Sequence, residues 1–187
     1  MSVVDAEGNA AAITTTINTG FGAGILVAGT GIILNDEMDD FALAPGVPNV
    51  YGLVGTAANA LAPGKRPQSS MSPTIVLAGR RPELVVGGSG GPTIISGTLQ
   101  VLLGVTAFGL PLGEAVLAPR LHDQAAPPVL AVEPGVEPDV RAVLERLGHH
   151  VVVTSAIGAV SACGLARDGS PVAAGDPRKD GGAAVVP

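Results

Sequence analysis

The stretch LVVGGSGGP, residues 84–92, joins an apolar strand to a helix that we predict over residues 92–108. Pro92 suits the first helical turn, because the amide hydrogen that proline lacks would have no helical partner there. The amides of Gly90 and Gly91 would then point outward at the positive end of the helix dipole. Such a pair can bind an anion, or an oxyanion if a carbonyl carbon is attacked nearby. A plain tight turn is the alternative interpretation.

Strands and helices follow one another in mixed order on both sides of this stretch. We predict strands at residues 3–4, 10–17, 31–34, 74–77, 84–86, 151–154, 159–165 and 172–174. Two further helices are expected at residues 112–118 and 139–147, the latter with apolar side chains at helical spacing. The order predicts one α+β domain over residues 1–187, in which two sheets lie between helices.

A long, irregular segment rich in proline and glycine occupies residues 42–73. A loop of that length inside a compact domain is usually functional or disordered. Its VYGLV segment, residues 50–54, is too apolar for disorder, so we expect a lid or a binding loop.

The composition excludes several classes of protein. Hydrophobic residues make up 47% of the 187 residues and charged residues 14%, which argues against disorder. The formal net charge is −6 and the sequence has no basic run, so nucleic acid is not an expected partner. No apolar run reaches the roughly 18 residues of a membrane span. The first residues do not read as a signal peptide, which leaves the destination of a longer parent chain open.

The segment NDEMDDF, residues 35–41, places four carboxylates within five residues. These groups repel one another unless they are solvated or meet a cation. Metal sites normally use histidine ligands or the spaced acidic pattern of a calcium loop, and neither occurs here, so no metal is expected. A site for a substrate ammonium group and a solvated acidic turn remain as the two interpretations.

A serine-rich segment, residues 64–73, carries hydroxyl groups at Ser69, Ser70 and Ser72. Such hydroxyls can donate hydrogen bonds to a carboxylate. A loop stabilised by its own hydrogen bonds is the alternative.

The remaining reactive side chains are interpreted as structural. Cys163 has no cysteine partner and lies in an apolar stretch that reads as a buried strand. His122, His149 and His150 show neither metal spacing nor an obvious serine or cysteine partner, so we expect them to be structural or on the surface.

Taken together, the segments resemble the small subunit of the γ-glutamyltransferase (glutathione hydrolase) family. They occur in the family's order and at about its spacing, and they span essentially the whole chain. The matching strings are SVVD (2–5), TINT (16–19), GIILNDEMDDF (31–41), PGVPNVYGLV (45–54), KRPQSSMSPTIV (65–76), GGPTII (90–95), APR (118–120) and DPR (176–178). The strings from the acidic, serine-rich and glycine-rich segments are long and specific.

The resemblance implies the αββα N-terminal-nucleophile hydrolase fold, of which this chain would be the small-subunit part. In the family a precursor cleaves itself, and the new N-terminal threonine of the small subunit attacks a γ-glutamyl amide. Water or an acceptor amine then resolves the acyl-enzyme. The resemblance also implies a large subunit as heterodimer partner, a γ-glutamyl small molecule as substrate, no cofactor, and a periplasmic or extracellular location.

The same resemblance implies catalytic roles for three residues and places a fourth over the pocket. Thr16 would hydrogen-bond the nucleophilic threonine and orient it. Gly90 and Gly91 would supply the oxyanion-hole amides. Tyr51 would lie in the lid-like loop over the pocket.

Five further residues would bind the glutamyl group of the substrate. Asn18, Glu37 and Asp40 would hold its α-amino and α-carboxyl end, with the two acids on the ammonium group. Ser69 and Ser70 would take the α-carboxylate.

The chain departs from the family in two respects. The nucleophilic threonine would come shortly before Met1, and the large subunit with its carboxylate-binding arginine is separate, so we expect the 187 residues alone to be inactive. We also expect them to be poorly soluble, because the face that meets the large subunit should be apolar. Gly88 and Ser89 stand where many members have Ser-Pro. The alternatives are a non-catalytic remnant of the family, or an amidase or acylase of the same fold with another specificity.

Overall fold

The computed structural model describes residues 1–166 and 168–186, and the chain divides into two compact units. The first unit comprises Met1–Thr14 and Ser70–Pro187, and the second comprises Thr15–Ser69. The first unit combines helices with mostly antiparallel strands, so the predicted α+β class is confirmed. None of the described helices is both long and apolar enough to cross a membrane.

A four-stranded antiparallel sheet in the order β11–β10–β6–β5 forms the centre of the first unit. Its strands are β5 (Thr74–Ala78), β6 (Arg81–Ser89), β10 (Ala159–Leu165) and β11 (Pro171–Ala174). The register pairs Ser89, the last residue of β6, with Ala159, the first residue of β10. The glycine-rich end of β6 therefore lies beside the chain that enters β10.

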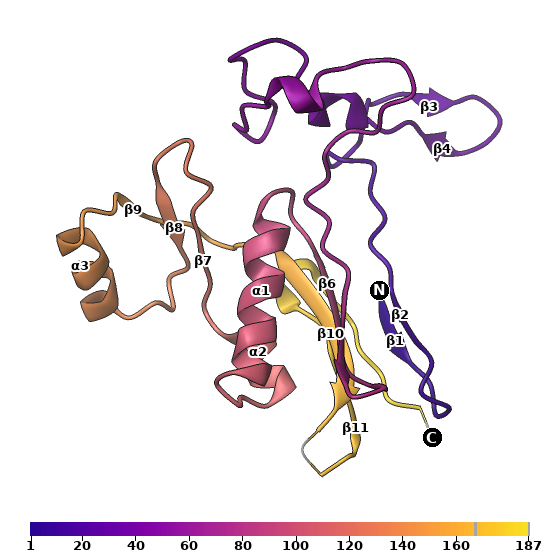
Figure 1. Ribbon diagram of the computed structural model, residues 1–187, viewed down its shortest axis with the longest axis vertical. Coiled ribbons are helices and arrows are strands. Elements are labelled where there is room, and N and C mark those ends of the chain that lie inside the picture. Colours follow the sequence, from indigo (N-terminus) through magenta and orange to yellow (C-terminus); the bar gives the residue numbers. More distant parts are fainter. Residues whose placement is uncertain (167, 187) are drawn as a thin grey trace. The chain divides into compact units, whose positions relative to one another are not determined.

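Helices α1 (Thr93–Thr106) and α2 (Leu112–Leu117) cover one face of this sheet (Figure 1). They pack closely, since a Cβ atom placed on Gly104 would lie 3.0 Å from the Cβ atom of Ala115. The core between helices and sheet is aliphatic. Its buried members are Leu84, Val86, Val101, Leu112, Ala115, Val116, Val160 and Ala162.

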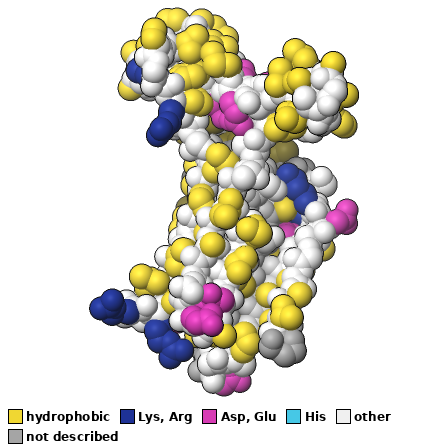
Figure 2. Space-filling model, turned by 90° about the vertical axis from the view of Figure 1, so that its right-hand side faces the viewer, with side chains coloured by type: hydrophobic (Ala, Val, Ile, Leu, Met, Phe, Trp, Pro, Cys, Tyr) yellow, Lys and Arg dark blue, Asp and Glu magenta, His cyan; other side chains and the backbone are white. Residues whose placement is uncertain are grey.

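Strands β1 (Ser2–Val4) and β2 (Ala10–Ala12) form an antiparallel hairpin on the opposite face of the sheet (Figure 1). The Ser2 hydroxyl donates a hydrogen bond of 3.0 Å to the Ser161 carbonyl on β10. Regular pairing ends at Ala12, so the strand predicted over residues 10–17 is shorter than expected. Figure 2 shows apolar side chains gathered on the face that carries this hairpin.

A second, mixed sheet has the order β7–β8–β9. Its strands are β7 (Leu121–His122), β8 (Leu130–Val132) and β9 (Val151–Val153). Strands β8 and β9 are parallel, which requires a crossover connection, and helix α3 (Pro138–Arg146) provides it. The helix confirms the one predicted at residues 139–147, whereas the short β7 and β8 were not predicted.

The second unit contains a short hairpin and two turns of 3-10 helix. The hairpin joins β3 (Leu26–Val27) to β4 (Ile32–Ile33), and the helices are η1 (Glu37–Asp40) and η2 (Ala57–Asn59). The Asn59 side chain donates a hydrogen bond of 2.7 Å to the Asp40 carbonyl and so ties η2 to η1. The long predicted loop therefore has a hydrogen-bonded framework of its own.

Candidate active site

The glycine-rich turn between β6 and α1 has a backbone that only glycine tolerates. Gly90 has φ +135° and Gly91 has φ +57°, conformations that other residues rarely adopt. A Cβ atom on Gly90 would also lie 2.5 Å from the Thr93 hydroxyl and 2.8 Å from the Cα atom of Gly158. The structure thus confirms the predicted strand–turn–helix context, with Pro92 in a helical conformation just before α1.

The acidic segment folds into η1, where its four carboxylates have different environments. The Asp36 carboxylate accepts hydrogen bonds from the Thr19 amide at 3.0 Å and the Thr19 hydroxyl at 2.7 Å. Asp39 accepts one from the Val50 amide at 2.9 Å. These two acids are engaged in holding the unit together.

Glu37 and Asp40 are half-buried and interact with each other. Burial raises the pKa of the Glu37 carboxyl, and its interaction with Asp40 raises it further. Burial likewise raises the pKa of Asp40, and the negative charges of Asp39 and Asp36 raise it further. The hydrogen bond with Glu37 acts in the opposite direction and lowers it. One oxygen of Glu37, Oε1, is buried and has no hydrogen-bond partner among the described residues.

Asn18 lies next to this acidic turn in a left-handed conformation, with φ +73°. Its amide donates to the Thr16 hydroxyl oxygen at 2.8 Å, and its side-chain nitrogen donates to the Asp36 carbonyl at 3.4 Å. The Tyr51 hydroxyl donates to the Asn18 carbonyl at 3.2 Å. Three of the predicted binding residues, Asn18, Glu37 and Asp40, therefore belong to one hydrogen-bonded region together with Thr16.

The boundary between the units falls between the two predicted carboxylate-binding serines. Ser69 is an exposed residue of the second unit, and Ser70 is a half-buried residue of the first. The Ser70 carbonyl accepts a hydrogen bond of 3.1 Å from the Ser72 hydroxyl. Among the predicted site residues, Ser70, Gly90 and Gly91 thus belong to the first unit and the others to the second.

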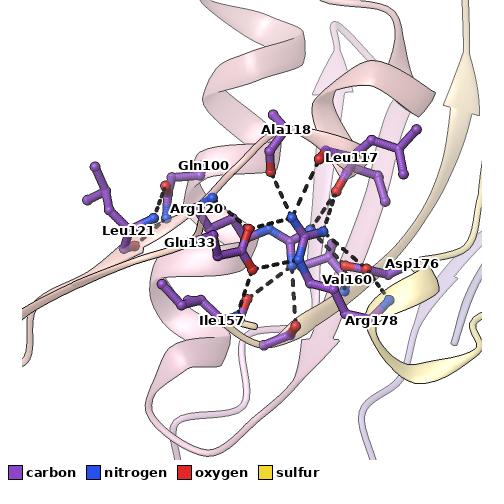
Figure 3. Close-up of polar contacts among 12 residues, drawn as sticks. Gln100, Leu117, Ala118, Arg120, Leu121, Glu133, Ile157, Val160, Asp176 and Arg178 are labelled. Atoms are coloured by element: carbon purple, nitrogen blue, oxygen red, sulfur yellow. Dashed lines mark hydrogen bonds and ion pairs between the residues drawn. The ribbon is translucent and has the colours of Figure 1, made fainter. Parts of the chain in front are cut away.

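A buried cluster of two arginines and two acids, which we call the charge cluster, was not predicted as functional (Figure 3). Arg120 forms an ion pair of 2.7 Å with Asp176, and Arg178 forms one of 2.6 Å with Glu133 and one of 3.2 Å with Asp176. Arg120 and Asp176 are each only 1% exposed. The signal for Arg120, Asp176 and Arg178 was present in the APR and DPR strings, but the strings did not include Glu133 or reveal that these side chains meet.

The charge cluster holds the backbone that precedes β10. Glu133 accepts a hydrogen bond of 2.8 Å from the Ile157 amide, and Arg120 donates one of 3.2 Å to the Ile157 carbonyl. Burial alone would raise the pKa of Glu133 and of Asp176, but hydrogen bonds and the arginine charges bring both below their ordinary values. The cluster therefore stays ionised and fixes the segment beside the glycine-rich turn.

The histidines agree with the expected structural or surface roles, but one has a serine partner that the sequence did not reveal. His122 does have a serine partner, because its Nδ1 atom lies 2.8 Å from the Ser96 hydroxyl oxygen, while Nε2 lies 3.0 Å from Gln124 Oε1. His149 and His150 are exposed, which confirms their assignment to the surface. Burial raises the pKa of the half-buried Cys163 thiol, in agreement with a structural role.

Residues 1–186 match the family model for Gamma-glutamyltranspeptidase. The chain belongs to the gamma-glutamyltranspeptidase family. It is 49% identical over 177 residues to the glutathione hydrolase proenzyme of Escherichia coli strain K12, covering 95% of this chain and 30% of that protein. It is also similar to a solved gamma-glutamyltranspeptidase from Pseudomonas nitroreducens complexed with L-DON, at 40% identity and a TM-score of 0.93, covering 100% of this chain and 98% of the solved one.

The chain is similarly close to a solved mutant of Helicobacter pylori gamma-glutamyltranspeptidase. The identity is 44% and the TM-score is 0.91, covering 96% of this chain and 98% of the solved one. The chain thus spans about a third of the length of the curated relatives it matches, but nearly all of one chain in these gamma-glutamyltranspeptidase structures. It corresponds to the small-subunit part of the family. The expected family and the N-terminal-nucleophile hydrolase fold are both confirmed.

Proposed function

We propose that this chain is the small-subunit part of a γ-glutamyltransferase or glutathione hydrolase that cleaves γ-glutamyl amides through a threonyl acyl-enzyme. The nucleophile in this proposal is the N-terminal threonine that precedes the SVVD string in the family. Its hydroxyl attacks the γ-carbonyl carbon, the amine leaves with a proton, and water or an acceptor amine then releases the glutamyl group.

The observation that carries the proposal is the pair of Glu37 and Asp40. A half-buried carboxyl pair with raised pKa values and an unpartnered oxygen is unfavourable until a cation arrives. The α-ammonium group of a glutamyl donor supplies that cation, together with hydrogen-bond donors for the free oxygen. Asn18, bonded into the same region, would bind the same end of the donor.

The proposal also assigns roles to the oxyanion amides, to the two serines and to Thr16. Gly90 and Gly91 would donate their amides to the oxyanion that forms at the γ-carbonyl. Ser69 and Ser70 would donate to the α-carboxylate. Thr16 would orient the nucleophile, because a hydroxyl that accepts the Asn18 amide still has its own hydrogen to donate.

A large subunit is the proposed partner, and the hairpin face supports this proposal. Met1, Val3 and Ile13 on or beside β1 and β2 are 68%, 45% and 46% exposed, and apolar side chains gathered on one face suit a protein interface. The Ser2 hydroxyl donates to the Ser161 carbonyl, and the proposal gives Ser2 no role as a nucleophile.

The test compares two donors on the complete two-chain protein. A γ-glutamyl anilide carries the α-ammonium group, whereas a glutaryl anilide of the same length lacks it and keeps the carboxylate. We expect rapid release of the aniline from the first donor and little from the second. Release from neither donor would refute the enzyme and favour a non-catalytic remnant. Preference for the glutaryl donor would favour an acylase of the same fold.

A further inference from the structure

The peptide that joins Gly90 to Gly91 is held from outside the turn by one side chain. The Thr93 hydroxyl donates a hydrogen bond of 2.6 Å to the Gly90 carbonyl, and the Thr93 amide donates a second of 3.2 Å. A peptide group is planar, with its carbonyl and its N–H on opposite sides. Whatever holds the Gly90 carbonyl therefore sets the direction of the Gly91 N–H.

This peptide needs such a hold because glycine flanks it on both sides. Gly90 and Gly91 can each adopt both signs of φ, so the peptide between them can rotate with little steric cost. A rotated peptide would present its carbonyl oxygen where the Gly91 N–H now points. An oxyanion hole in that state would lose one donor and gain a repulsive oxygen.

The Thr93 hydroxyl is itself enclosed. A Cβ atom on Gly158 would lie 3.1 Å from this hydroxyl oxygen and 3.3 Å from the Ser89 carbonyl oxygen. Gly158 has φ +60°, and the carbonyl of the preceding Ile157 accepts a hydrogen bond from Arg120 of the charge cluster (Figure 3). The cluster thus keeps Gly158 against Thr93, and Thr93 keeps the peptide in one orientation.

We propose that Thr93 is a positioning residue for the oxyanion hole. Gly158 packs beside the Thr93 hydroxyl and holds it in place. This inference rests on the proposed function, because it assigns the Gly91 amide to the oxyanion. Thr93 acts through the Gly90 carbonyl and need not touch the substrate.

The kinetic test uses the complete two-chain protein with a γ-glutamyl anilide. Thr93→Val removes the hydroxyl and keeps the shape, so we expect kcat to fall about tenfold, less than the roughly 100-fold that follows loss of a whole oxyanion donor. KM should stay within about twofold, because the donor is bound elsewhere. Thr93→Ser, which keeps the hydroxyl, should restore most of kcat.

The matched control is Thr106→Val. Thr106 lies on the same helix, and its hydroxyl also donates to a backbone carbonyl, that of Leu102, at 2.8 Å. This variant loses an equivalent hydrogen bond far along the helix from the turn, so its kcat should equal that of the wild type. A second pair of variants distinguishes the strain of a side chain at positive φ from the loss of space beside Thr93. Gly158→Ala should lower kcat, whereas Gly79→Ala, at the similar φ of +64° but in open space, should not.

Hydrogen–deuterium exchange gives a readout that does not need turnover. Peptides that span residues 89–94 should exchange faster in Thr93→Val than in Thr93→Ser, Thr106→Val or the wild type. Equal exchange in all four proteins would overturn the inference whether or not the enzyme is active. An unchanged kcat for Thr93→Val in an active enzyme would overturn it too and leave the proposed function intact. An inactive wild type would instead refute the proposed function.

Discussion

The charge cluster and the Glu37–Asp40 pair of the acidic turn both contain a glutamate and an aspartate, and the pKa values of these acids shift in opposite directions. In the charge cluster, Glu133 and Asp176 are buried against arginines and have lowered pKa values. In the acidic turn, Glu37 and Asp40 are half-buried beside other acids and have raised pKa values. Burial acts in the same direction in both regions, so the partners decide the outcome.

The difference distinguishes carboxylates that complete the fold from carboxylates that await a ligand. The charge cluster pairs each buried carboxylate with an arginine of the same chain and contributes rigidity, although Arg120 Nε has no hydrogen-bond partner among the described residues. An acidic pair without a counter-charge stores unfavourable energy that a bound cation releases. A shifted pKa by itself therefore does not locate a binding site. A carboxylate that has a raised pKa and no cationic partner within the chain is a better indicator of such a site.

The largest expected effect is on the stability of the charge cluster. Arg120→Met removes one arginine and leaves a buried Asp176 with only part of its pairing, which should cost about 3–5 kcal/mol of unfolding free energy. Urea denaturation of the complete protein measures this loss. The control is Arg80→Met, on an exposed arginine, which should change stability by less than about 0.5 kcal/mol. A small loss for Arg120→Met would mean that the cluster does not brace the fold.

Next in size is the effect of neutralising the acidic turn. Glu37→Gln and Asp40→Asn should each raise KM for the γ-glutamyl anilide by about tenfold, which corresponds to about 1.4 kcal/mol, with no loss of stability. Asp39→Asn is the matched control, because its remaining oxygen can still accept the Val50 amide. If all three variants raised KM equally, the turn would act through its net charge and the pairing of Glu37 with Asp40 would not matter.

The two regions should also respond oppositely to acid. The pKa values of Glu37 and Asp40 are raised, so these groups become protonated as the pH falls through values above their ordinary 4.5 and 3.8, and KM for the donor should rise there. When ionised, these two carboxylates lower the free energy of unfolding. Protonation over the same pH range removes this unfavourable contribution.

The charge cluster has the reverse sign. Glu133 and Asp176 have lowered pKa values, so their stabilisation is complete above the ordinary 4.5 and 3.8 and is lost only as the pH falls through their lower folded values. Donor binding should therefore weaken at a pH where the fold is still intact. Measuring KM and the urea midpoint across pH 3–7 tests this order, and simultaneous loss of both would contradict it.

The smallest expected effect concerns Asp36, the paired acid within the acidic turn. Although burial acts the other way, hydrogen bonds from Thr19 hold the pKa of Asp36 below its ordinary value. Asp36→Asn should cost about 1 kcal/mol of stability and should change KM less than Glu37→Gln does. A larger change in KM for Asp36→Asn would place it with the ligand-binding acids.

Sequence patterns predicted the strand–turn–helix around Gly90 and Gly91 because glycine spacing and Pro92 encode that geometry locally. The strings also predicted the family, and with it the acidic turn. They did not predict the charge cluster, since Arg120, Glu133 and Asp176 are far apart in sequence and meet only in the folded chain. The serine partner of His122 was missed for the same reason, because Ser96 lies on a helix and His122 on a strand.

The end of helix α2 depends on a residue that comes some sixty positions later in the chain. Arg178 donates hydrogen bonds to the carbonyls of Val116, at 3.0 Å, and Ala118, at 3.0 Å. A helix of only six residues is not stable by itself, and its last carbonyls need partners. During synthesis on the ribosome, the Ala118 carbonyl therefore gains this partner only after residue 178 has left the exit tunnel. The Val116 carbonyl can be held earlier, because Arg120 also donates to it at 2.8 Å.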